Sequence, residues 1–223
     1  MRATLGFLEK LTLSPAEIRP EDVAALRSEG VDDQSITDAI YVCAGFNIIT
    51  RIAEAFGFKV PPTKVFTAGA KFLRIFGYQR LSGIHLGSIS NRFPRQVYGD
   101  QLKDDSAPIR YGFAADPYAG KLERLKDAVL YGPGVVDPEL RRVACAAGEI
   151  PGAMGSYVKK VVQRAYEVTE EDIAGLRQSG WSEDEIFEIT VSAALGAGLV
   201  RIESGLAALC SKYSPVMPEL ARV

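Results

Sequence analysis

The chain of 223 residues contains one histidine, three cysteines and one tryptophan. A single histidine, His85, cannot supply a metal site that is built from several histidines. Cys43, Cys145 and Cys210 form no Cys-x-x-Cys pair and are odd in number. The sequence therefore predicts no metal centre, no bound cofactor and no disulfide framework, and it indicates a reducing compartment.

An excess of one charge and long apolar runs are also missing. The formal net charge is −2, so no global field attracts the chain to nucleic acid or anionic lipid. The longest weakly polar stretch, Thr190–Val200, is shorter than the roughly 20 residues that a membrane span needs. The first ten residues do not resemble a signal peptide. We therefore expect a cytoplasmic protein that binds neither membranes nor nucleic acid.

The main positive feature is a repeat at a spacing of 150 residues. One gapless register relates Glu21, Asp22, Leu26, Arg27 and Gly30 to Glu171, Asp172, Leu176, Arg177 and Gly180, and it continues to Arg51 and Arg201. A fixed offset of this kind predicts two copies of one supersecondary unit. We call two residues 150 positions apart counterparts.

Each copy has the pattern of three helices, which predicts an all-α fold. The expected helices cover 6–13 and 156–164, then 20–28 and 170–178, and then a long third helix in each copy. Gly30 and Gly180 suit the left-handed position after a helix, while Ser182 with Glu185 forms a capping box. Asp32 and the pair of Thr169 with Asp172 are the other expected caps.

Between the copies we expect helices at 62–78, 121–130 and 138–146, and an irregular segment over 80–120. The predicted organisation is a first repeat at 1–60, a connecting part at 61–136, a second repeat at 137–212 and a tail at 213–223, with one shared core for the repeats. The segment Ala193-Ala-Leu-Gly-Ala-Gly198 lies inside the second long helix. Small residues there predict a close helix crossing, in a packed core or at a subunit interface; the alternative is a ligand cleft.

The ordered pattern resembles a known family. The segments Phe7–Leu13, Glu21–Arg27 and Phe46–Gly57, with Tyr157–Val161, Glu183–Glu188 and Ala193–Ala197 in the second copy, are similar to alkylhydroperoxidase D-like proteins. These belong to the carboxymuconolactone decarboxylase superfamily, and the likeness is to its peroxidase-related branch. The resemblance covers about 5–58 and 137–209. It implies an all-helical fold, homo-oligomers and, in active members, thiol peroxidase or decarboxylase activity.

The chain departs from that family at the redox centre. Active peroxidases carry a Cys-x-x-Cys followed by a histidine, because one thiolate attacks the peroxide and the second cysteine resolves the sulfenic acid. Before the second copy only Cys145 is present. Cys145 and His85 remain the candidate catalytic residues. Cys43 has Ala193 as its counterpart and is predicted to be a small buried core residue.

Arg51 and Arg201 are the candidate substrate-binding residues. Each borders the apolar stripe of a long helix. One interpretation is a partly buried ion pair with an acid of another helix, such as Asp22 or Asp172. The other is a guanidinium that binds a substrate carboxylate through two hydrogen bonds.

Three functional hypotheses follow. The first is a superfamily member without the redox cysteines that binds a small molecule, such as a carboxylate, or has a non-redox lyase activity. It predicts an unpaired guanidinium in a closed pocket. The second is a non-enzymatic oligomeric scaffold, which predicts ion-paired arginines and no cavity between them. The third is a peroxidase with one reactive cysteine, Cys145.

Overall fold

The structure is a computed structural model that describes residues 2–58, 63, 67 and 116–211. The chain divides into one unit formed by 1–58 and 108–223 and a second formed by 59–107. The helices below all belong to the first unit. Of the predicted helix at 62–78 only residues 63 and 67 are described, and both are helical. His85 and residues 80–115 of the predicted irregular segment lie outside the residues described.

Every regular element over the described ranges is helical, so the predicted all-α class is confirmed. In chain order the elements are α1 (Arg2–Leu13), the 3₁₀ turn η1 (Pro15–Glu17), α2 (Pro20–Ser28), α3 (Asp33–Ala55), α5 (Ala119–Leu130), α6 (Pro138–Cys145), α7 (Gly152–Arg164), η3 (Ala165–Glu167), α8 (Glu170–Gln178) and α9 (Glu183–Cys210). The bounds of α2 and α8 are those predicted. Both α1 and α7 begin four residues earlier than predicted, and α5 begins within the segment that was expected to be irregular.

The helix ends follow from local side-chain chemistry. Ser182 accepts a hydrogen bond from the Glu185 amide and forms a capping box with it, and Asp32 caps α3 by accepting from the amide of Ser35. Thr169 and Asp172 form the same kind of box at α8. After α2 and α8, Gly30 and Gly180 have φ of +83° and +94°, which residues with a Cβ rarely adopt. The predicted caps are confirmed.

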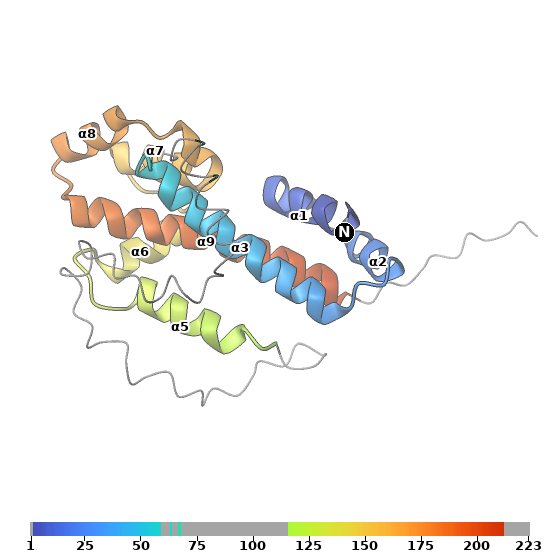
Figure 1. Ribbon diagram of the computed structural model, residues 1–223. Helices are drawn as coiled ribbons and strands as arrows, with labels where there is room; N and C mark the ends of the chain where they lie inside the picture. Colours follow the sequence, from blue (N-terminus) through green and yellow to red (C-terminus); the bar gives the residue numbers. More distant parts are fainter. Residues whose placement is uncertain (1, 59–62, 64–66, 68–115, 212–223) are drawn as a thin grey trace, which may run out of the picture. The chain divides into compact units, whose positions relative to one another are not determined.

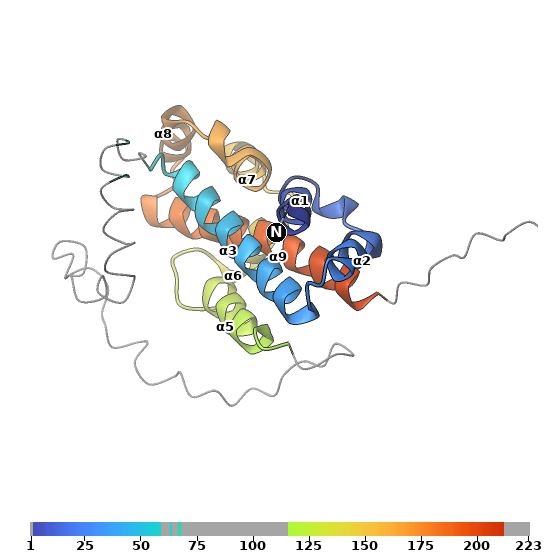
Figure 2. The same cartoon turned by 45° about the vertical axis from the view of Figure 1, so that its right-hand side comes forward.

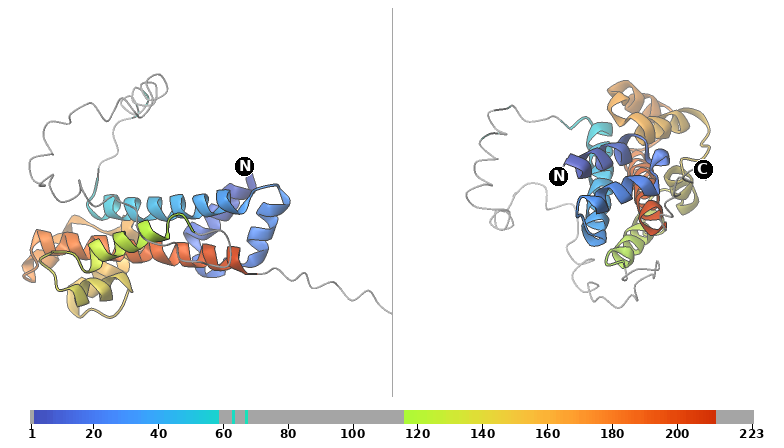
Figure 3. Two further views of the ribbon diagram at one scale, coloured as in Figure 1. Left: turned by 90° about the horizontal axis from the view of Figure 1, so that it is seen from below. Right: turned by 90° about the vertical axis from the view of Figure 1, so that its right-hand side faces the viewer.

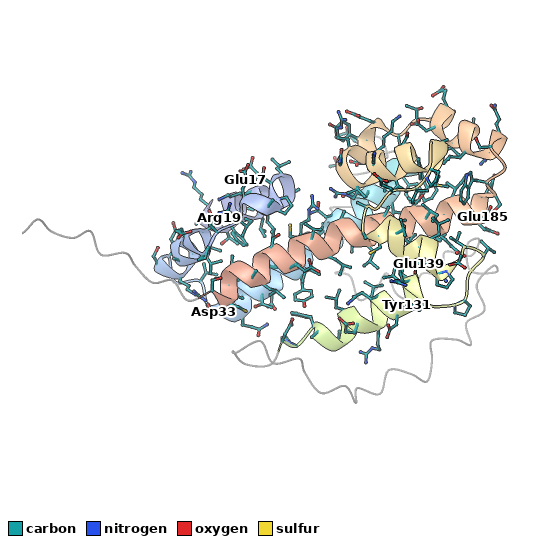
Figure 4. The ribbon with its side chains drawn as sticks, turned by 180° about the vertical axis from the view of Figure 1, so that it is seen from behind. Glu17, Arg19, Asp33, Tyr131, Glu139 and Glu185 are labelled. Carbon is teal, nitrogen blue, oxygen red and sulfur yellow. The ribbon has the colours of Figure 1, made fainter. Side chains whose placement is uncertain are left out.

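The two long helices, α3 and α9, lie side by side and run in opposite directions (Figure 1). Figure 4 shows Asp33, in the first turn of α3, and Glu185, in the first turn of α9, at opposite ends of this pair. Helices α1 and α2 pack near one end of the pair and α7 and α8 near the other (Figure 3). This arrangement brings α1 and α7 to the same side of α3 and α9 (Figure 2).

Helices α5 and α6 cover α9 on another side. Two acids that are counterparts hold this segment. The carboxylate of Asp38 accepts a hydrogen bond of 2.7 Å from the Tyr118 hydroxyl, and the carboxylate of Glu188 accepts from the amides of Val135 and Val136 at 2.8 and 2.9 Å. These bonds hold the start of α5 and the connection between α5 and α6, and both helices line cavities of the protein.

The apolar core has two parts. One lies around the start of α3, where the buried members include Phe7, Leu11, Val23, Leu26, Ile36 and Ile40. The other lies around the start of α9 and includes Tyr157, Val158, Val161, Leu176, Ile186 and Ile189. Both parts follow the helical stripes seen in the sequence, because residues three and four apart share one face of a helix.

The close helix crossing predicted from the small residues of α9 is present. A Cβ on Gly198 would lie 2.6 Å from Cγ1 of Ile48 in α3, and one on Gly205 would lie 2.9 Å from the Ile40 side chain. A Cβ on Gly196 would overlap the carbonyl oxygen of Cys145, at the end of α6. The glycines therefore let α3 and α6 approach the backbone of α9.

Two helices are long and apolar enough to cross a membrane by length and composition alone. These are α3 and α9, with mean hydropathies of 1.3 and 1.4 over 18 residues. Both helices are longer than Thr190–Val200, the stretch on which the expectation of no membrane span was based. The α9 window is 61% buried inside the protein and the α3 window 28%. The core helix of a soluble protein passes the same test, so the expectation of a cytoplasmic protein stays a prediction.

We predict that Gly196→Ala destabilises the protein by about 1–3 kcal/mol, because the new Cβ meets the backbone of α6 and forces it to move. Gly175→Ala is the matched control. Gly175 also lies in a helix, its added Cβ would meet nothing within 4 Å, and its counterpart is Ala25. This control should stabilise by up to about 1 kcal/mol. Urea unfolding of both variants measures the difference; equal effects would contradict the close approach of α6.

Candidate functional site: a buried arginine pair

Arg51 lies on α3 and Arg201 on α9, and each is three residues beyond the contact between Ile48 and Gly198. Because α3 and α9 are antiparallel, three residues in each direction separate the two positions by about 9 Å along the helix axes. Two long side chains can bring their guanidinium groups together over that distance. The side chain of Arg201 is buried, at 7% exposure, and Arg51 is half-buried.

The two arginines make corresponding hydrogen bonds. Arg51 donates to the carbonyl of Asn47, one turn earlier, at 3.0 Å and to the carbonyl of Val162 in α7 at 3.2 Å. Arg201 donates to the carbonyl of Ala197, one turn earlier, and to that of Thr12 in α1, at 2.6 and 2.7 Å. Thr12 and Val162 are counterparts in the last turns of α1 and α7.

The bonds to Val162 and Thr12 supply hydrogen-bond donors to carbonyls at the ends of α7 and α1. The last four carbonyls of a helix have no partner within it, and the carboxyl end carries a partial negative charge that favours a cation. Each arginine therefore caps a helix of the other half of the chain. Arg141 does the same for α5, since its guanidinium donates to the carbonyls of Val129 and Gly132 at 2.9 and 2.8 Å.

The acids proposed as partners of these arginines bind elsewhere. Asp22 pairs with Lys10 and Asp172 with Lys160, both at 2.7 Å. Over residues 2–58 and 116–211, neither Arg51 nor Arg201 forms an ion pair with a carboxylate. Within the described residues the structure shows no ion pair of the kind expected, and carbonyl and amide oxygens accept hydrogen bonds from both guanidinium groups instead.

The electrostatics of the pair reflect this missing counter-charge. Burial, and to a smaller extent the positive charge of Arg51, lower the pKa of Arg201 to about 10. Burial also lowers the pKa of Arg51, which Glu54 partly offsets. In addition, the Nε of Arg201 is buried and has no hydrogen-bond partner. A buried donor without a partner costs free energy, so the site holds two cations and at least one unused donor.

On one side, polar side chains adjoin the pair. Asn47 accepts a hydrogen bond of 2.8 Å from Arg51 at its Oδ1, Thr12 lies 3.3 Å from the Sγ of Cys43, and Cys43 acts electrostatically on Arg201. The counterparts of these three residues are Ala197, Val162 and Ala193. The polar side of the site therefore exists in one half of the chain only.

Sequence reasoning missed this polar group. Cys43 was predicted to be a buried core residue, and its 7% exposure confirms that burial. However, the sequence analysis did not group Cys43 with Thr12 and Asn47. The signal that could have found the group is the exchange of Thr12, Cys43 and Asn47 for apolar residues at all three counterpart positions.

Three cavities lie elsewhere in the protein, and neither arginine lines them. One of about 260 Å³ lies between α5 and α9, and one of about 470 Å³ lies where α5 and α6 meet α9. A third of about 540 Å³ lies between the end of α3 and the start of α8. The first hypothesis predicted a closed pocket around an unpaired guanidinium. Neither guanidinium group has a carboxylate partner among the described residues, but neither lines one of these cavities.

Cys145 borders the second cavity, beside Lys126 and Glu203. Burial raises the pKa of its thiol, Lys126 lowers it and Glu203 raises it again. The thiol is therefore protonated at neutral pH, which disfavours nucleophilic attack on a peroxide. All three cysteines are free thiols. Among the described residues, no group of three or more His, Cys, Asp or Glu side chains could hold a metal ion.

We predict that Cys145 reacts slowly with iodoacetamide in the folded protein. Because burial raises its pKa, the reactive thiolate is scarce at pH 7 and increases as the pH rises through 9. The folded protein should be alkylated at this residue at least tenfold more slowly than the urea-unfolded protein, as measured by mass spectrometry of the peptide.

A matched assay follows peroxide consumption, in which Cys145→Ser should equal the unchanged protein. Fast alkylation of folded Cys145 at pH 7, together with a lower peroxide rate in that variant, would restore the single-cysteine peroxidase hypothesis.

Comparison with known proteins gives no further assignment: no family model, no curated protein and no solved structure matches this chain.

Proposed function

We propose that the chain binds a small carboxylate between Arg51 and Arg201. The observation that carries this proposal is a pair of guanidinium groups, that of Arg201 buried and that of Arg51 half-buried, which influence each other and have no carboxylate partner in the described part of the chain. A planar guanidinium matches the two oxygens of a carboxylate. A bound anion would supply the missing negative charge and an acceptor for the Nε of Arg201.

The surroundings of the pair limit the size of the ligand. Both arginines lie outside the three cavities described above, between helices that are in close contact. A compact carboxylate of the size of formate or acetate fits these conditions better than a large substrate. The resemblance to the carboxymuconolactone decarboxylase superfamily is consistent with a carboxylate ligand, and a non-redox lyase activity on such a molecule is the enzymatic form of this proposal.

The proposal also includes the architecture, which is two copies of one helical unit related by a two-fold axis. Two such copies would agree with the resemblance, which recurs in both halves of the chain. The helix bounds support it, since α2 and α8 are offset by 150 residues at both ends. So do the ion pairs Lys10–Asp22 and Lys160–Asp172. In addition, Ile48 touches its own counterpart, Gly198, as residues on a two-fold axis must.

An experimental structure tests this architecture. We expect residues 2–55 to superpose on 152–205 helix by helix, and the bonds of Arg51 and Arg201 to exchange under the same rotation. The repeat proposal would be wrong if the two segments superposed only as single helices.

A non-enzymatic scaffold is the second candidate, and one observation favours it. Both arginines already cap helix ends across the two halves of the chain, so their positions have a structural reason without any ligand. Against the scaffold stands its own expectation of ion-paired arginines, which the described residues do not meet. The two candidates differ in whether an added anion stabilises the protein.

Carboxylate binding is tested by thermal unfolding in sodium acetate or formate, with sodium chloride at the same ionic strength as reference. A ligand that binds only the folded state stabilises it by RT ln(1 + [L]/Kd), about 2.7 kcal/mol at 100 times Kd. We therefore expect acetate to raise Tm by several degrees, and neutral acetamide to have no effect.

The same titration separates specific from general effects with two variants. Arg201→Met should remove the acetate-dependent rise, measured from its own Tm in chloride. Arg164→Met is the matched control, because Arg164 lies on α7 with a side chain that is 59% exposed and pairs with Glu167. An equal rise in all three proteins, or no rise in the unchanged protein, would favour the scaffold.

A further inference from the structure

We infer that Asn47 is a positioning residue of this site: it holds Arg51 through a neutral amide and so leaves the charge of the arginine pair for an external anion. This inference rests on the proposed carboxylate binding and adds a residue whose neutrality leaves the charge of the pair available to the anion. Asn47 is buried, at 6% exposure, within the polar side of the site.

The orientation of the Asn47 amide is fixed by its neighbours. Its Nδ2 donates to the carbonyl of Cys43 at 2.9 Å, and also lies 3.4 Å from the Oγ1 of Thr12. The Oδ1 must then face Arg51, whose Nη1 donates to it at 2.8 Å. If the amide were turned over, its NH₂ would face a guanidinium, and an oxygen would face the carbonyl of Cys43. Neither contact can form a hydrogen bond.

The choice of an amide at this position has an electrostatic consequence. An aspartate has almost the same shape as asparagine and could accept the same bond from Arg51. It would, however, bring a negative charge against the pair, and a buried guanidinium usually has such a partner. With asparagine, Arg51 is held at its Nε and its Nη1, and no described carboxylate forms an ion pair with it, although Glu54 acts on it electrostatically.

The counterpart of Asn47 shows what the site is like without this side chain. Ala197 offers Arg201 only its carbonyl oxygen, and the Nε of Arg201 is left without a partner. The two arginines therefore differ in function: Arg51 is fixed in place and adds charge, whereas Arg201 retains an unused donor. The carboxylate is expected to bind through the Nε side of Arg201, next to Thr12, Cys43 and Asn47.

Acetate-dependent thermal unfolding of Asn47→Asp and Asn47→Ala tests this role. Asn47→Asp supplies the missing charge within the protein, so the acetate affinity should fall at least tenfold. Asn47→Ala matches the counterpart and keeps both positive charges, so it should retain binding with an affinity reduced only a few-fold. Each rise in Tm is taken from the variant's own Tm in chloride, which removes differences in basal stability.

A purely structural role predicts the opposite order, because alanine loses more hydrogen bonds than aspartate. The inference is therefore overturned if Asn47→Asp binds acetate like the unchanged protein, or if Asn47→Ala loses binding completely. Circular dichroism checks that both variants fold; if Asn47→Asp does not, the result for Asn47→Ala alone decides. Absence of acetate binding in the unchanged protein would instead reject the proposed function.

Discussion

The close contact between α3 and α9 is the constraint on which the rest of the structure depends. Gly198 and Gly205 remove the side chains that would keep these helices apart, so that Ile48 and Ile40 pack directly on the α9 backbone. Side chains longer than a hydrogen at these points would overlap their neighbours, and a packed interior cannot absorb such overlap without moving whole helices. The same contact brings Arg51 and Arg201 near each other.

That proximity carries an electrostatic cost that the protein meets in an uncommon way. Buried arginines are usually balanced by carboxylates, but here partial charges at helix ends and one neutral amide take that place. The partial charge of a helix terminus is about half an elementary charge, so two such ends and an amide orient the guanidinium groups without cancelling them. This residual charge is the physical basis for proposing a small anion as the ligand. Burial is the main reason that the pKa of Arg201 is lowered to about 10, and the charge of Arg51 is the second.

The asymmetry between the halves is as informative as their likeness. The bounds of α2 and α8, the glycines that follow these helices and the lysine–aspartate pairs recur at the spacing of 150 residues, whereas Thr12, Cys43 and Asn47 are replaced by Val162, Ala193 and Ala197. The polar group therefore occurs once, as do Gly198 and Gly205. Its role follows from its contact with the arginine pair, since Asn47 accepts a hydrogen bond from Arg51. Cys145, which has no counterpart at this spacing, is a weak candidate for chemistry because burial raises the pKa of its thiol.

The sequence by itself determined the all-helical class, the bounds of α2 and α8, the caps at Asp32, Thr169 and Ser182, and the close crossing at Gly198. Each of these depends on residues within one or two turns of each other, where spacing and side-chain type act directly. The partners of Arg51 and Arg201 and the cluster around Asn47 were decided only by the tertiary structure. The bonds of the two arginines to Val162 and Thr12 join residues more than 100 positions apart. Which carbonyl a guanidinium reaches over such a separation depends on how the helices pack, and local spacing in the sequence does not determine that packing.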